Sequence, residues 1–489
     1  MADVSRRGLL VGAAAVTGLA AAGIIAGSVI TRQAGRDERG NNWDVIVVGA
    51  GSAGIGAARR LIDQNPSLRV AIVEARDRIG GRMFTDRTSM GIPVERGCEL
   101  VHGGPYADTY PWIKEAGFDM RMFSKNYIRL NNAGDSSPSH AWHAPDAPAS
   151  WAFPAGIPDG LVRFDPAGEG QPLPEVLPRE KADAYLARLG IAPDNIPSGL
   201  RYLLTDDAEP LYATDATAVG EVLTACIRYS LHPEEAPEPE KLDPDDPKYN
   251  DGDYKIIGGY DQLLTFIADD IPVFLDTVVE EVQHSKSGVE LVTSQGTMSA
   301  RRVVMAVPAG VMQRRGIDFT AGLPDRKWVA FDEFQYSHIF KCLLEFEGQV
   351  FTPDGSATWG YAESMDLTPT TLWNASIAQP DYGGQVIVGW ETGEAARELH
   401  ALPLEQKYEA VLDVVRKSAG DPGLRYKKAL MTDWANEPFS WGAYGHGGNE
   451  KDMSAPTDDV LFWAGMRTST VTASYVSGVD QADELLKHL

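Results

Sequence analysis

Between residues 43 and 74 the apolar positions form two short runs separated by a helical pattern. Residues 45–48 and 68–73 are rich in β-branched side chains and nearly free of polar ones, which is typical of strands buried on both faces of a parallel sheet. Between the two runs, apolar residues return at helical spacing from Ile55 to Ile62. The pattern predicts a strand, a helix and a second strand, the unit from which α/β proteins are built.

A glycine-rich turn joins the first predicted strand to the helix. In the spacing of Gly49, Gly51 and Gly54, the first glycine makes a tight bend, the second lets backbone approach a pyrophosphate and the third lets helix pack on strand. The helix would then direct its first amide groups at the phosphates. Glu74 closes the second strand 23 residues after Gly51, close to the distance at which an acid meets ribose hydroxyls. Since this carboxylate would repel a 2′-phosphate, the unit predicts NAD or FAD rather than NADP.

The sequence R-I-G-G-R at residues 78–82 follows this unit, although a single nucleotide-binding unit does not need it. Together with the glycine turn and Glu74-Ala75-Arg76, it resembles the FAD-binding signature of the flavin amine oxidase family. That family includes monoamine and polyamine oxidases, L-amino-acid oxidases and flavin histone demethylases. The resemblance implies FAD as the cofactor and Arg76, Gly81 and Arg82 as residues that contact it, because the longer FAD needs further phosphate-directed groups.

Further segments resemble the same family. Residues 94–104, VERGCELVHGG, are similar to the segment that passes over the flavin, and the resemblance places His102 facing the catalytic cavity. Val279 matches a valine whose backbone meets the adenine, and residues 306–308 match a strand end common to the family. The residues alone indicate only strands and hairpins here.

Among these matches, a lysine within an apolar run points most directly to a role in the reaction. Residues 339–346 have the composition of a strand, and a buried lysine at position 341 is costly unless it has a partner. In the family a lysine in this context holds a water at flavin N5; the alternative for Lys341 is a side chain that snorkels to solvent. Residues 430–446 resemble a family segment whose aromatics, here Trp434 and Tyr444, wall the amine pocket, the alternative being two aromatics in a core.

The C-terminal segment departs from the family pattern. Gly465, expected to contact the cofactor, is followed by Met466 where relatives carry a glutamate, and Thr472-Ala473-Ser474 stands where relatives carry His-Gly-Ala. The acid that helps hold the phosphate and ribitol is thus missing. The segment has no cysteine, which excludes a thioether to the flavin by that route and predicts non-covalent FAD. The departures leave open a changed flavin pocket or a member that has lost activity.

Composition and charge limit the classes of partner that the protein is expected to bind. The 489 residues suit about two domains, and 44 basic against 69 acidic residues give a net charge of −25. This charge disfavours nucleic acid and favours a cationic small molecule, although it could simply maintain solubility. Three cysteines without CxxC spacing or a nearby histidine pair predict neither a metal site nor a disulfide framework.

The N-terminal 42 residues read as a targeting segment. Arg6-Arg7 precedes an Ala- and Gly-rich apolar stretch that ends near Ile30, which resembles a twin-arginine export signal and predicts a periplasmic or extracellular protein. The stretch is also long enough for an uncleaved membrane anchor.

The predicted fold is α/β, with a Rossmann-like FAD-binding domain and a discontinuous substrate-binding domain built on a mixed sheet plus helices. The active site is expected where the two domains meet. The FAD-binding domain is predicted from residues 43–100, 254–330 and 455–489, and the substrate-binding domain from residues 101–253 and 331–454.

The resemblance implies oxidation of an amine C–N bond. Hydride passes to flavin N5, the imine hydrolyses to an aldehyde or ketone, and O2, or another electron acceptor, is reduced, in the first case to H2O2. Two alternatives remain. One is an L-amino-acid oxidase, which would need an arginine for the substrate carboxylate, and the other is a flavin-binding protein with little turnover. The oligomeric state stays open, and a homodimer is compatible with the sequence.

Overall fold

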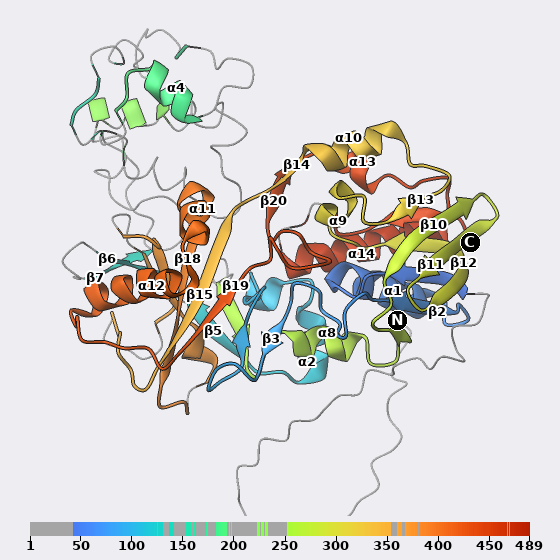
Figure 1. The fold of residues 1–489 in the computed structure, drawn as a ribbon, viewed down its shortest axis with the longest axis horizontal. Helices are drawn as coiled ribbons and strands as arrows, with labels where there is room; N and C mark the ends of the chain where they lie inside the picture. Colours follow the sequence, from blue (N-terminus) through green and yellow to red (C-terminus); the bar gives the residue numbers. More distant parts are fainter. Residues whose placement is uncertain are drawn as a thin grey trace, which may run out of the picture.

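The computed structural model describes most of the chain from residue 43 onward (Figure 1). The predicted leader or anchor, residues 1–42, and long parts of residues 141–251 lie outside the described residues. The described residues are 43–124, 126–130, 136–140, scattered positions between 153 and 232, 252–353, 359–363, 367–379, 381–466, 468 and 470–489.

The first sheet has eight strands within the described part of the chain. Its order is β13-β10-β11-β12-β1-β2-β9, and β21 pairs with the end of β12. β1 is parallel to its neighbours β2 and β12, and β2 is parallel to β9, whereas β10, β11 and β12 are antiparallel. The strands are β1 (Trp43–Val48), β2 (Val70–Val73), β9 (Val273–Phe274), β10 (Val279–Ser285), β11 (Gly288–Thr293), β12 (Gly296–Met305), β13 (Asp318–Phe319) and β21 (Leu461–Trp463).

This sheet is covered on both faces, which explains the continuous apolar run of β1. Val45 and Val47 pack into one hydrophobic cluster with α1, α8 and α14, whereas Ile46 and Val48 pack into a second cluster with α9, α10 and α13. Alternate residues of a strand face opposite sides of a sheet, so both sides of β1 must be apolar. The predicted strand, helix and second strand are confirmed as β1, α1 and β2. The helices that pack in these two clusters are α1 (Ser52–Gln64), α2 (Tyr110–Ala116), α8 (Asp261–Ile267), α9 (Ala309–Gln313), α10 (Asp325–Glu333), α13 (Glu450–Ser454) and α14 (Val471–Leu486).

The last helix, α14, packs directly along the first, α1. A Cβ added at Gly478 of α14 would stand 2.0 Å from the Ala53 carbonyl oxygen, and one added at Gly56 of α1 would stand 2.6 Å from that of Tyr475. The two helices therefore approach backbone to backbone, which only glycine allows. Residues at the C-terminal end of the chain thus complete the domain that begins at residue 43.

The second sheet lies at the other end of the molecule (Figure 1) and has seven strands among the described residues, in the order β19-β15-β18-β17-β16-β6-β7. The strand predicted at residues 339–346 is confirmed as β15. Most neighbours are antiparallel, but β16 is parallel to β6, so the sheet is mixed. The strands are β6 (Asn126–Leu130), β7 (Ser136–His140), β15 (Ile339–Phe346), β16 (Tyr361–Glu363), β17 (Thr371–Asn374), β18 (Gln385–Thr392) and β19 (Lys428–Thr432).

The two faces of the second sheet have different neighbours. Phe340 and Leu344 of β15 pack under helices α11 (Gly393–Ala401) and α12 (Leu404–Ala419) on the outer face. Leu343, Trp373 and Trp390 face the other way and pack with residues of the segment 90–94 and with Tyr444. By strand alternation Lys341 shares this inner face.

Several short elements lie outside the two large sheets. Among the described residues, none of the helices is both long and apolar enough to cross a membrane. The short elements are β3 (Thr85–Asp86) with β4 (Val94–Glu95), β5 (Met120–Ser124) with β8 (Asp253–Ile256), β14 (Phe334–Tyr336) with β20 (Gly445–Gly447), the 3-10 turns η2 (Gly104–Tyr106) and η7 (Ala375–Ala378), and α4 (Ala182–Arg188).

Candidate active site

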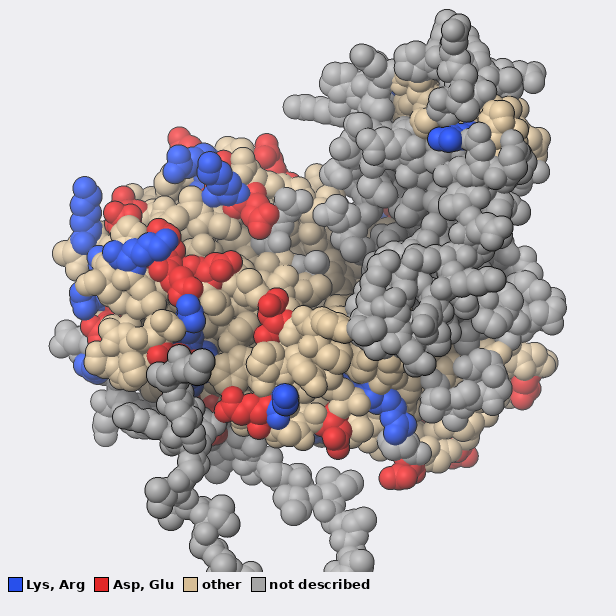
Figure 2. Space-filling view, turned by 180° about the vertical axis from the view of Figure 1, so that it is seen from behind, with Lys and Arg blue, Asp and Glu red and all other residues tan. Residues whose placement is uncertain are grey.

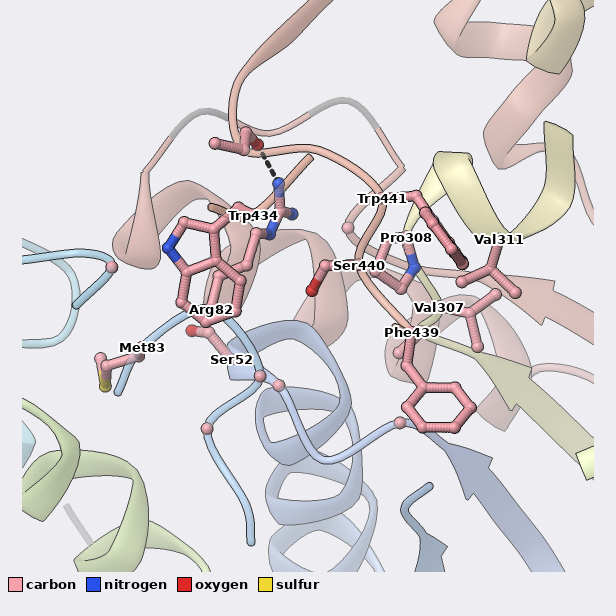
Figure 3. A pocket seen from close by; sticks show the side chains of 18 of the residues that line it. Ser52, Arg82, Met83, Val307, Pro308, Val311, Trp434, Phe439, Ser440 and Trp441 are labelled. Atoms are coloured by element: carbon pink, nitrogen blue, oxygen red, sulfur yellow. Dashed lines mark hydrogen bonds between the residues drawn. The ribbon is translucent and has the colours of Figure 1, made fainter. Parts of the chain in front are cut away.

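A cavity of about 310 Å3 is lined by residues of both predicted domains. One end is formed by Glu74, Arg76 and the start of β10, and the other by Lys341 and Tyr444. Figure 3 shows Arg82 and Trp434 at one side of this space and Trp441 at the other, above the N-terminal end of α1. The cavity therefore connects the predicted nucleotide unit with the predicted catalytic residues.

The three glycines of the turn occupy three different environments. Gly49 has φ of +106°, and Gly54 lies so close to the turn that an added Cβ would stand 1.9 Å from the Gly49 carbonyl oxygen. Gly51, in contrast, lines the cavity and has no atom within 4 Å of an added Cβ. Gly49 and Gly54 are thus required by the fold, whereas the open space at Gly51 is of the kind that a close-fitting ligand needs.

The N-terminal end of α1 is suited to bind an anion. Its cap residue is Gly51, no side chain caps it, and its first turn contains no acidic residue. The first amide groups of a helix lack partners within the helix, and the helix dipole adds positive character there. The 13-residue helix therefore offers uncapped N–H groups at the cavity, where a pyrophosphate would bind.

Glu74 lies at the end of β2 in the cavity wall. Its carboxylate accepts a hydrogen bond from the Ala50 amide at 2.7 Å and from the Arg76 amide at 2.9 Å. Burial raises the pKa of Glu74, and the two amide bonds oppose this rise. The carboxylate thus ties the glycine turn to the end of β2 and stands where the sequence places a ribose contact.

The other predicted cofactor contacts, Arg76, Gly81, Arg82, Val279 and Gly465, all line the same cavity. Arg76 donates to the Pro438 carbonyl at 2.6 Å and to the Ser440 hydroxyl at 2.9 Å. Arg82 donates to the Ala443 carbonyl, the dashed line in Figure 3. Both arginines therefore connect the first domain to the segment that carries the predicted aromatic wall.

Trp434 and Tyr444 stand at the far end of the cavity. The Trp434 indole donates to the Arg96 carbonyl at 2.9 Å, and the Tyr444 ring meets Trp390 edge to face, with 6.1 Å between centroids. These contacts fix two flat apolar surfaces beside Lys341. Both residues line the cavity, and Tyr444 also packs against the core cluster on the inner face of the second sheet.

Lys341 is buried, with only 3% of its surface exposed, so the alternative of a side chain that snorkels to solvent is wrong. Its Nζ donates to Glu99 Oε2 at 2.8 Å and to the Gly97 carbonyl at 3.1 Å. Lys255 Nζ donates to the other oxygen of Glu99 at 2.5 Å. Burial opposes ionisation of Glu99, but the two ammonium groups outweigh it and lower the pKa to about 2.

His102 is the predicted catalytic residue that the structure does not bring to the cavity. Its ring is about half exposed, and Nδ1 pairs with Asp253 Oδ1 at 2.6 Å. Asp253 also accepts from the Tyr361 hydroxyl at 3.3 Å. The prediction of a side chain that faces the cavity is wrong in this structure, because the ring pairs with Asp253 and does not line the cavity.

Several residues at the site were not found by sequence reasoning. Sequence reasoning did not identify Glu99 and Lys255, although each is a charged residue in an apolar stretch. The same signal identified Lys341. Glu95 is a further buried acid, whose pKa burial raises to about 7. Phe439 and Trp441 also line the cavity, with φ of 66° and 56°. This backbone conformation is rare for residues with large side chains, and no sequence motif indicated it.

The atypical C-terminal residues are part of the fold. Met466 is buried in the core behind the cavity, and Thr472 Oγ1 lies 3.3 Å from Thr109 Oγ1. The Thr470 hydroxyl caps α14 by accepting from the Ala473 amide at 3.0 Å. The start of α14 is therefore capped by its own chain, unlike that of α1.

The residues present fit FAD. The open turn at Gly51 and the uncapped helix suit phosphates, and Glu74 suits a ribose. The cavity continues to the aromatic residues Trp434 and Tyr444. No group of three or more His, Cys, Asp or Glu side chains that could hold a metal ion occurs among the described residues.

Comparison with known proteins supports this assignment at the level of the whole chain. Residues 52–486 match the family model described as flavin containing amine oxidoreductase. Polyamine oxidase 3 of Oryza sativa subsp. japonica is 27% identical, over 90% of this chain and 88% of that protein. Lysine-specific histone demethylase 1 homologs 3 and 2 of Arabidopsis thaliana are 26% and 25% identical, over 90% and 92% of this chain. The chain spans only 30% and 59% of these two demethylases.

Solved structures resemble the fold over most of its length. Wild-type putrescine oxidase bound to putrescine has a TM-score of 0.66 at 19% identity and covers 91% of this chain and 99% of its own. Cyclohexylamine oxidase from Brevibacterium oxydans IH-35A has a TM-score of 0.65 at 18% identity, with 91% and 99% covered. The predicted α/β fold is thereby confirmed.

Proposed function

Because the chain belongs to the flavin containing amine oxidoreductase family, which confirms the resemblance read from its motifs, we propose that it binds FAD and oxidises a small amine. The observation that carries the proposal is the single cavity that runs from the glycine turn and Glu74 to Lys341, Trp434 and Tyr444. It places a dinucleotide site and an apolar, cation-tolerant pocket in one continuous space.

The FAD phosphates would be held by the turn at Gly51 and the first amides of α1, the ribose by Glu74, and the flavin end near Arg82 and Lys341. When bound, FAD would supply the redox chemistry, as acceptor of a hydride from the carbon beside the amine nitrogen and as donor of two electrons to an acceptor such as O2, which would give H2O2. The bound cofactor is non-covalent in this proposal, since the segment 461–489 contains no cysteine.

The protein's own residues bind and orient the amine. Trp434 and Tyr444 exclude water on two sides, and desolvation between them lowers the pKa of an alkylammonium, which favours the neutral amine whose lone pair assists C–H cleavage. Lys341 has one N–H left after its bonds to Glu99 and Gly97 and can hold a water at the reacting end of the cavity. No protein nucleophile is required. Hydrolysis of the resulting imine to an aldehyde or ketone would consume one water.

A cationic small molecule is the proposed substrate class. The net charge of −25 attracts it, although basic side chains lie among the acidic ones on the face shown in Figure 2. The similar proteins include a polyamine oxidase and a putrescine oxidase bound to putrescine, and the chain covers most of each. These two relatives support a free amine as the substrate to test first.

One experiment tests the proposal. Purified protein should be yellow, release FAD on acid denaturation, and produce peroxide with at least one member of a panel of diamines, polyamines and monoamines. Peroxide from L-amino acids alone would support the amino-acid oxidase alternative. A yellow protein inert toward every compound, both with O2 and with artificial electron acceptors, would indicate a binding protein, and a colourless protein that FAD does not reconstitute would refute the proposal.

Export by the twin-arginine route is a further part of the proposal, supported by Arg6-Arg7 and the apolar stretch that follows. This route suits a protein that folds around its cofactor before crossing a membrane. Replacement of both arginines by lysine should retain the protein in the cytoplasm, and cell fractionation would show whether it does.

A further inference from the structure

Glu99, Lys255 and Lys341 form a buried cluster of charges, here called the lysine-glutamate cluster. None of the three exposes more than 7% of its surface. Each oxygen of the Glu99 carboxylate accepts from a different lysine, at 2.5 Å and 2.8 Å. The Trp373 indole donates to the same oxygen as Lys341, at 3.0 Å. The carboxylate is therefore fully occupied and held from three sides.

The members of the cluster have different positions relative to the cavity. Lys341 lines the cavity, whereas Glu99 and Lys255 lie behind it. Lys341 Nζ bonds Glu99 and the Gly97 carbonyl, which leaves one of its three donors for the cavity among the described residues. Glu99 thus restrains the ammonium group from behind while one N–H remains available in front.

The second lysine is not needed to neutralise the carboxylate. A Glu99 and Lys341 pair alone would be neutral, and burying the further ammonium of Lys255 costs free energy that a hydrophobic side chain would avoid. Lys255 is accommodated by a bond to the Ala375 carbonyl at 3.1 Å and by the Phe123 ring, 5.9 Å away. Two ammonium groups around one carboxylate leave a net charge of one positive unit beside the cavity.

We propose that Glu99 and Lys255 are positioning residues for Lys341: Glu99 fixes its ammonium at the cavity wall, and Lys255 keeps the lysine-glutamate cluster cationic. A fixed positive charge in a site shielded from water favours the negative charge that a flavin gains on reduction. The inference rests on the proposed function, since it requires FAD in this cavity.

The midpoint potential of the bound flavin tests the inference, because each substitution changes the net charge of the lysine-glutamate cluster and so predicts the direction in which the potential shifts. Glu99→Gln removes a negative charge and should shift the potential to a more positive value. Lys255→Met removes a positive charge and should shift it to a more negative value. The double variant restores the net charge and should return the potential close to that of wild type. Measurement at about pH 6 keeps the neighbouring Glu95, whose pKa is raised to about 7, mostly protonated.

The double variant also separates charge from position. Its potential should match wild type, but Lys341 has lost its carboxylate, so anaerobic reduction of the flavin by the amine should be slower than in wild type. Lys427→Met is the matched control, because it removes a lysine that is half exposed on the surface, where solvent screens it. It should leave the potential unchanged.

Two results would overturn the inference. One is a potential that does not move in either single variant, and the other is a shift of both in the same direction. If Glu99→Gln fails to fold with two unpaired lysines, Lys255→Met and the double variant still give the comparison. Wild-type protein that binds no flavin would refute the proposed function and this inference with it, whereas flavin-loaded variants with unshifted potentials would refute this inference alone.

Discussion

Replacement of Glu95 by glutamine is expected to stabilise the protein at pH 8 and to change its stability little at pH 5. The carboxyl is buried at the end of β4 and accepts hydrogen bonds from the Tyr260 amide at 2.8 Å and from the Thr85 hydroxyl at 2.9 Å. Burial raises its pKa from 4.5 to about 7, and the charge of Glu99 adds to the rise, while Lys255 opposes it. Glutamine keeps an oxygen for the Tyr260 amide and offers its own amide to the Thr85 hydroxyl.

The direction of the effect follows from proton binding. Between pH 4.5 and about 7 the folded protein keeps a proton on Glu95 that the unfolded chain has released, so stability falls as the pH rises through this window. The pKa difference corresponds to about 3 kcal/mol of unfolding free energy at pH 8. The stabilising contribution is complete below pH 4.5 and is lost above about pH 7. Glutamine has no charge to bury and escapes the loss.

Urea unfolding at pH 5 and pH 8, followed by tryptophan fluorescence with FAD in constant excess, measures the difference between variant and wild type. Glu290→Gln on β11 is the control, since this glutamate is exposed and its replacement should give the same small difference at both pH values. A difference in unfolding free energy between Glu95→Gln and wild type that is independent of pH would refute the reasoning. A higher unfolding free energy of wild type at pH 8 would refute it as well.

Three further predictions concern the cofactor and the domain that binds it. Gly51→Val is expected to weaken FAD binding by roughly tenfold or more with little change in the melting temperature of the apoprotein, because only a ligand would meet the new side chain. Gly54→Ala should instead lower the melting temperature through a clash with Gly49. Scanning fluorimetry with an FAD titration distinguishes the two variants, and equal effects of both would contradict this prediction. Lys341→Met is expected to slow anaerobic flavin reduction or reoxidation by roughly 10²-fold, and stopped-flow rates equal to wild type would remove this lysine from the mechanism. Gly478→Val is expected to destabilise the protein by about 3 kcal/mol through overpacking of α14 on α1 and to release flavin, so a variant that keeps its colour and its urea midpoint would count against the close helix contact.

The first strand, the first helix and the second strand could be predicted closely because their information is local. The apolar run of β1, the glycine spacing and the helical pattern of α1 lie within residues 43–74, and each element is determined by its own residues. Of the cofactor contacts predicted from these motifs, Gly49, Gly51 and Glu74 line the cavity, whereas Gly54 packs behind the turn. Strand β15 was predictable for the same reason, since its apolar residues are consecutive.

The rest of the site depends on contacts between distant parts of the chain. Glu99 meets Lys255 and Lys341 across 156 and 242 residues, and no local pattern shows which charges will meet. His102 was misplaced because its partner, Asp253, is 151 residues away and pairs with the ring outside the cavity lining. The left-handed backbone of Phe439 is imposed by packing, since a large side chain does not favour it.

The contact between α1 and α14 sets the order in which the protein can mature. On the ribosome, the glycine turn is made early, but its last supporting helix, Val471–Leu486, emerges about 420 residues later, which is roughly 20 to 80 s at ordinary rates of translation. A nascent chain therefore carries an unfinished binding cleft until residues 471–486 have emerged. Flavin capture is expected only after that point, and chains that terminate before residue 471 are expected to lack the prosthetic group altogether.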